Sequence, residues 1–181
     1  MLFLLLAAEG VTILFIRPLL SVHVFIGMLL IPPVALKLGS TGWRFLRYYT
    51  GDGAYRAKGA PLLPLRMLAP LVVASTAVLF STGVGLLIFG PGRGFLLGLH
   101  RASFVVWLVA TGIHVLAHLR RVPRLVLADW RPAGPAGLSG SFARRTLVAA
   151  ALVAGVVLAL VTVRYAQPWI HWEEVFQGHD R

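Results

Sequence analysis

Four of the six histidines in this sequence lie inside strongly apolar stretches, where an ionisable side chain is costly. The four are His23, His100, His114 and His118. An imidazole can bind a metal ion or a haem iron, relay a proton, or hydrogen-bond to a neighbouring helix. Ionisable groups at membrane depth usually face the interior of a bundle, so three histidines within residues 95–119 indicate a functional site.

The spacing of these three histidines places them on one face of a helix. At about 100° per residue, the step from His100 to His114 falls about 40° short of four turns, and the step to His118 completes five turns. At about 1.5 Å per residue, His100 and His114 stand about 21 Å apart along the axis. Two stacked haems would fit that separation.

His23 is the expected partner of His100. Haem iron in an electron carrier takes two axial ligands from opposite sides, and a neutral imidazole binds it without adding charge. In the topology given below, both histidines lie about six residues from the outer end of their spans, so they are level. We expect them to hold a haem on the outer side; the alternative is a histidine pair hydrogen-bonded across helices.

Several residues in the inner half of the bundle are candidate ligands for a second haem. Lys37 stands fourteen residues after His23, where a second histidine would complete the pattern. Lys37 ligates a haem opposite His114, or another group does so, or the inner site lacks haem and Lys37 extends to the interface. Two haems are slightly favoured over one. Either His114 or His118 can be the ligand while the other donates to a propionate or a quinone.

Charged residues near the spans have two interpretations each. Arg101 outside, and Arg47 or Arg66 inside, can pair with haem propionates or can anchor a helix at the interface. Glu9 is the one acid in a predicted span. It can pair with a cation, relay protons, or form a salt bridge to a neighbouring helix.

The elements that must position these residues are membrane helices. Hydrophobic residues make up 58% of the 181-residue chain, charged residues 13%, and the mean hydropathy is +0.83. A soluble domain has about 45–50% apolar residues. The sequence predicts an all-α, polytopic transmembrane helix bundle, a single domain over residues 1–181 with haem inside a four-helix core. The predicted spans, about five in number, are residues 1–16, 18–38, 67–90, 95–119 and 145–165.

The basic residues predict how the bundle lies in the membrane. Most of them gather in the loops after the second and fourth spans, which fall on the same side. By the positive-inside rule that side is the cytoplasm, which predicts a multi-pass protein of the cell membrane with its N-terminus inside and its C-terminus outside. The net charge of +11 is thereby explained without nucleic acid, which we do not expect as a partner.

The absence of cysteine narrows the chemistry. Without a thiolate, the chain cannot form disulfides, ligate an iron–sulfur cluster or attach c-type haem covalently. Any haem must therefore be non-covalent b-type haem held by other ligands. No nucleophile and base stand at a spacing that would support a catalytic triad, so we expect an electron-transfer subunit or partner rather than a self-contained enzyme.

The histidine helix resembles that of a known group. The stretch Leu-His100-Arg-Ala-Ser-Phe, followed by His114-Val-Leu-Ala-His118, resembles the haem-bearing helix of small bacterial b-type cytochromes, and His23-Val-Phe-Ile-Gly27 is similar to their partner helix. The wider group includes ferric-reductase-like and dihaem quinone-linked proteins. The resemblance covers about half the chain and implies haem between paired helices. Lys37 departs from its two-histidine pattern.

Three functions compete on this basis. The first is electron transfer through bis-histidine haem in a respiratory chain, between a quinone pool or partner redox subunit and an acceptor. The second is a metal-binding membrane transporter that uses His114 and His118, one turn apart. The third is a haem-free structural subunit of a membrane complex. Haem content and metal content separate the three.

Overall fold

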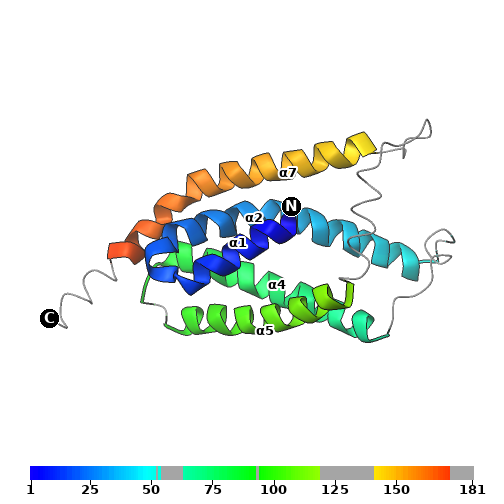
Figure 1. Ribbon diagram of the computed structural model, residues 1–181, viewed down its shortest axis with the longest axis horizontal. Coiled ribbons are helices and arrows are strands. Elements are labelled where there is room, and N and C mark those ends of the chain that lie inside the picture. The colour runs from blue at the N-terminus through cyan, green and yellow to red at the C-terminus, as the bar shows by residue number, and fades with distance from the viewer. Residues whose placement is uncertain (52, 54–62, 93, 119–140, 172–181) are drawn as a thin grey trace.

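The computed structural model describes residues 1–51, 53, 63–92, 94–118 and 141–171 (Figure 1). These residues form helices and short connections, as the apolar segments predict. The elements are α1 (Leu2–Leu14), α2 (Ile16–Tyr49), α4 (Leu63–Phe89), α5 (Gly94–His118), α7 (Ser141–Thr162) and the 3-10 helix η1 (Val163–Ala166). The predicted all-α fold class is confirmed.

Within the part of the chain that the structure describes, four helical segments are long and apolar enough to cross a membrane: Ile16–Tyr49, Met67–Phe89, Gly94–Ala117 and Ala143–His171. Many of their large apolar side chains are exposed, which suits contact with lipid. Helix α1 differs, because its 13 residues extend only about 20 Å, against a hydrocarbon core of about 30 Å. In Figure 1 the N-terminus lies near the middle of α2. Helix α1 is therefore shorter than the full membrane span that the sequence predicts for residues 1–16.

Helix α2 continues well beyond the predicted span of residues 18–38. It has 34 residues and ends at Tyr49, which gives a length of about 51 Å. Hydropathy locates the part of a helix that lies in lipid, and does not locate the end of its hydrogen-bond ladder. Gly39 and Gly42 weaken a helix without ending it, so α2 continues into its exposed, basic and aromatic last turns.

Helix α2 is central to the bundle. Helices α1 and α7 both pack against it, while α4 and α5 pack against each other (Figure 1). Pro33 has no amide hydrogen, so the carbonyl of Leu29, four residues earlier, loses its helical donor. Gly155 of α7 lies against that carbonyl, and a Cβ atom at Gly155 would clash with it. The α2–α7 contact therefore depends on a proline in one helix and a glycine in the other.

Four helix ends meet at one end of the bundle (Figure 1). Helix α2 ends, α4 begins, α5 ends and α7 begins at the same end of the bundle (Figure 1). Arg47 in the last turn of α2, and Arg144 and Arg145 in the first turns of α7, lie at that end. The opposite end carries the α1–α2 and α4–α5 connections, where the predicted outer site lies.

Candidate functional site

A cavity of about 660 Å³ separates the α1–α2 pair from the α4–α5 pair. Its volume lies within the range of about 300–1,000 Å³ that is typical of ligand sites. Its walls are almost entirely aliphatic and aromatic side chains. The lining also includes a small set of polar and charged residues: Glu9, His23, His100, Arg101 and Thr111. An apolar site with few polar groups is the usual form of a cofactor pocket.

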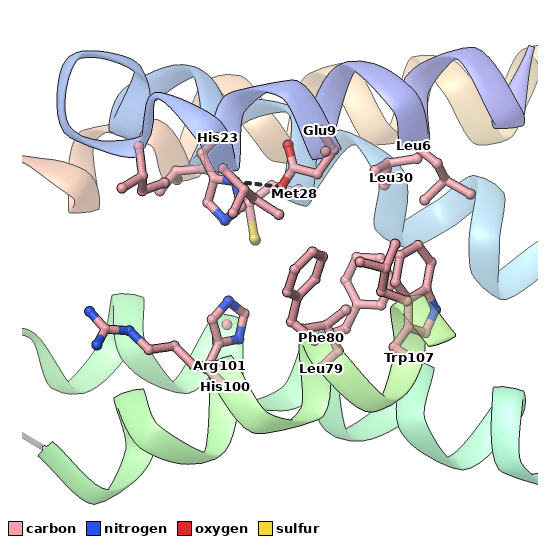
Figure 2. A pocket seen from close by; sticks show the side chains of 18 of the residues that line it. Leu6, Glu9, His23, Met28, Leu30, Leu79, Phe80, His100, Arg101 and Trp107 are labelled. Atoms are coloured by element: carbon pink, nitrogen blue, oxygen red, sulfur yellow. Dashed lines mark ion pairs between the residues drawn. The ribbon is translucent and has the colours of Figure 1, made fainter. Parts of the chain in front are cut away.

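The imidazoles of His23 and His100 face each other across this cavity (Figure 2). His23 comes from the first third of α2, and His100 from the first third of α5. The structure thus brings together, at one depth, the two histidines that the sequence paired.

The Nδ1 atom of His23 is held by two residues of α1. It lies 3.0 Å from Oε1 of Glu9 and 2.9 Å from the hydroxyl oxygen of Thr12. The Thr12 hydroxyl donates its own proton to the backbone carbonyl of Glu9 at 2.6 Å. It can therefore only accept from the ring, which makes Nδ1 of His23 the protonated nitrogen.

His100 is held in the same way by α4. Its Nδ1 atom lies 3.0 Å from the hydroxyl oxygen of Thr82. That hydroxyl lies 2.8 Å from the carbonyl of Val78 and 3.0 Å from the carbonyl of Leu79, so its proton is donated back into its own helix. The ring nitrogen must again be the donor, and the proton of His100 sits on Nδ1.

A third threonine shows that this arrangement is systematic. The indole nitrogen of Trp107, which can only donate, bonds to the hydroxyl oxygen of Thr76 at 3.0 Å. The Thr76 hydroxyl donates in turn to the carbonyl of Val72 at 2.6 Å. Thr12, Thr76 and Thr82 are all buried, with exposed fractions of 3%, 4% and 5%. Each buried threonine accepts an N–H bond from a ring on a neighbouring helix.

These hydrogen bonds determine which nitrogen of each histidine is available to bind a metal. With the proton on Nδ1, the Nε2 atom of each ring carries the free lone pair. In the uncharged form of each ring, the Nε2 atoms on the two sides of the apolar cavity are therefore the unprotonated, metal-binding nitrogens. The hydrogen bonds at Nδ1 fix each ring in place, as the outer partners of metal-binding histidines do.

Two glycines provide the space for this arrangement. A Cβ atom at Gly83 of α4 would lie 3.3 Å from Cε1 of His100, tighter than an ordinary contact. A Cβ atom at Gly27 of α2 would lie 3.2 Å from Oε1 of Glu9. Larger residues at either position would displace the groups that line the site.

Of the other predicted site residues whose side chains the structure describes, only Arg101 lines this cavity. Arg101 lines the cavity and is exposed, so it stands at the rim beside His100 (Figure 2). Lys37 is exposed, and His114 is half-buried; neither lines the cavity. The structure does not bring Lys37 and His114 together there. The side chain of His118 lies outside the described residues.

Arg47, the inner arginine of the sequence prediction whose side chain the structure describes, does not line the cavity. Arg47 is exposed at the far end of α2, with its guanidinium 5.7 Å from the ring centroid of Trp43. The side chain of Arg66 lies outside the described residues. The positions of the described residues do not test the inner haem, which stays a prediction from the sequence.

Sequence reasoning missed Thr12 and Thr82 as partners of the histidines. It also missed Trp169, whose indole lines the cavity and donates to the carbonyl of Leu86 at 3.2 Å. The signal in the sequence was the threonines themselves. A threonine hydroxyl in a membrane helix donates its proton to a backbone carbonyl of the same helix, and its oxygen can still accept one hydrogen bond. Which ring it accepts from depends on which helices pack together.

Among the described residues, no three His, Cys, Asp or Glu side chains gather into a group that could hold a metal ion alone. A bis-histidine haem needs only one residue on each face of the iron. Comparison with protein-family models, with curated proteins and with solved structures finds no match for this chain.

Proposed function

We propose that this chain is a membrane b-type cytochrome that carries single electrons through a haem held between His23 and His100. The observation that carries the proposal is the pair of imidazoles that face each other across one apolar cavity, with both Nδ1 atoms within hydrogen-bond distance of protein oxygens. A histidine pair present only for packing would more simply hydrogen-bond to each other. These two bond away from each other instead.

The residues of the site suit haem in three respects. His23 and His100 offer neutral nitrogen ligands from opposite sides. The walls are mainly aliphatic and aromatic, and burial among such side chains is one of the means by which proteins set a haem potential. Arg101 stands at the rim, where a cation can pair with a propionate carboxylate. Haem, when bound, supplies the one-electron exchange between ferric and ferrous iron.

The cellular setting is part of the same proposal. The common end of α2, α4, α5 and α7 carries the basic residues, which favours a cytoplasmic position for that end. The haem would then lie toward the outer face of the cell membrane. With haem in that position, the chain would carry electrons between a quinone or a partner redox subunit of a respiratory chain and an acceptor.

The test is a reduced-minus-oxidised spectrum of the purified full chain, with haem and metal quantified per chain. We expect a Soret band and a reducible α-band in the wild type, and loss of the haem between the two histidines in His23→Ala and His100→Ala. His171→Ala is the matched control, because His171 is exposed and its Nδ1 bonds to the carbonyl of Gln167 outside the cavity. It should retain full haem.

The opposing outcomes are equally specific. A colourless chain with bound zinc or copper would support the transporter alternative, and a colourless, metal-free chain the structural subunit. Haem retained at full occupancy in His23→Ala would refute the pairing with His100.

A further inference from the structure

The acidic residue Glu9 has no assigned role beyond its contact with His23. It is the one Asp or Glu within the part of the chain that the structure describes. It comes from α1, the short helix, and its side chain is only 16% exposed among apolar neighbours. Burying a carboxylate at this depth is costly, and such groups are usually retained for a function.

The geometry directs the carboxylate at one atom. Oε1 of Glu9 lies 3.0 Å from Nδ1 of His23, while Oε2 is buried without a hydrogen-bond partner. Gly27 leaves the space that Oε1 occupies. Helix α1 thus places a single acceptor of potential negative charge directly behind one of the two proposed iron ligands (Figure 2).

We propose that Glu9 is a positioning residue that makes His23 the stronger electron donor of the two axial imidazoles, and so lowers the reduction potential of the haem. This inference rests on the proposed cytochrome function. A carboxylate that accepts the Nδ1 proton raises the basicity of the ligand nitrogen. Its negative charge opposes reduction, because ferric iron carries one more positive charge than ferrous iron and is stabilised by a nearby anion.

The two halves of the site provide an internal comparison. Thr82 lies behind His100 at the same 3.0 Å that separates Glu9 from His23, but its hydroxyl is neutral. One imidazole therefore has an acidic partner and the other an uncharged one. The two imidazoles that would hold the iron therefore differ, because a carboxyl group that can carry charge lies behind His23 and a neutral hydroxyl group lies behind His100.

The experiment is a redox titration of the haem-loaded full chain, with Glu9→Gln compared with Thr82→Val. Glutamine keeps an oxygen that accepts the Nδ1 proton and removes the charge. At a fixed applied potential we expect the ratio of reduced to oxidised haem to rise about ten-fold in Glu9→Gln, equivalent to about 59 mV for one electron. Thr82→Val should shift it less.

A Glu9→Gln protein with the wild-type potential would overturn the inference, and so would a Thr82→Val shift of equal size and sign. If Glu9→Gln holds no haem, Glu9→Asp decides: retention of haem near the wild-type potential supports the role of the charge, and loss of haem overturns it. A wild-type chain without haem refutes the proposed function itself, whereas bound haem with equal potentials refutes only the role of Glu9.

Discussion

His23 and His100 are anchored to opposite halves of the bundle and face each other between them. His23 bonds to Glu9 and Thr12 of α1, and His100 bonds to Thr82 of α4. The α1–α2 pair and the α4–α5 pair are separated along the cavity. A group bound to both Nε2 atoms would therefore join two parts of the molecule that have little other contact at that depth.

Haem binding is accordingly expected to stabilise the bundle. A ligand at about 100 times its dissociation constant adds about 2.7 kcal/mol to the free energy of unfolding when it binds only the folded chain. The measurement is the thermal unfolding midpoint of the haem-free and haem-loaded chain in the same detergent. In His100→Ala the added haem should leave the midpoint unchanged, and an equal gain there would contradict the bridging role.

Gly83 is predicted to be required for the position of His100. Valine at this site would place its Cβ 3.3 Å from Cε1 of the ring and add two methyl groups, so the imidazole must move. We expect Gly83→Val to lower haem affinity about ten-fold or more, the scale seen when ligand positioning is lost. Gly98→Val is the control, because a Cβ there meets nothing within 4 Å. Similar haem content in both variants would contradict the prediction.

Much of this architecture could be predicted because membrane helices are regular. Apolar length locates the segments, and counting residues from the outer ends places His23 and His100 at one depth. The prediction needed no knowledge of side-chain packing, since both histidines lie in helices that run in the same direction.

The remaining details depend on which helices are neighbours, and the sequence does not state this. Thr12 and Thr82 become acceptors for the histidines only because α1 packs on α2, and α4 packs on α5. The contact of Gly155 with the Leu29 carbonyl requires α7 to lie beside the proline of α2. The end of α2 at Tyr49 was missed for a different reason, because its last turns are helical but not apolar.

Arg101 is predicted to raise the haem potential slightly. A positive charge at the cavity rim favours the reduced form, so Arg101→Gln should lower the ratio of reduced to oxidised haem. Because the side chain is exposed, the effect should be about 0.2–1 kcal/mol and should shrink as salt is raised. Redox titration at two salt concentrations measures it. Arg164→Gln, an exposed arginine outside the cavity lining, is the control.

His114 is predicted to be dispensable for the haem between His23 and His100, since it does not line their cavity. In His114→Ala the absorbance of that haem should be unchanged. The total haem per chain then shows whether a second haem binds in the inner half of the bundle. A fall to about half the wild-type content would show a second haem that depends on His114. An unchanged content would show that no haem depends on His114, and loss of all haem would contradict the separation of the two positions.

Gly155 is predicted to be the position in α7 least tolerant of a side chain. A Cβ atom there would clash with the backbone of Leu29, which cannot rotate away as a side chain could. Gly155→Ala should destabilise the bundle by about 1–3 kcal/mol, the usual cost of overpacking. Gly98→Ala in α5 is the control: its Cβ enters open space, and alanine favours a helix more than glycine does. Thermal unfolding in one detergent should rank Gly155→Ala below the wild type and Gly98→Ala at or above it. The reverse order would show that α7 can shift away from α2 at no cost.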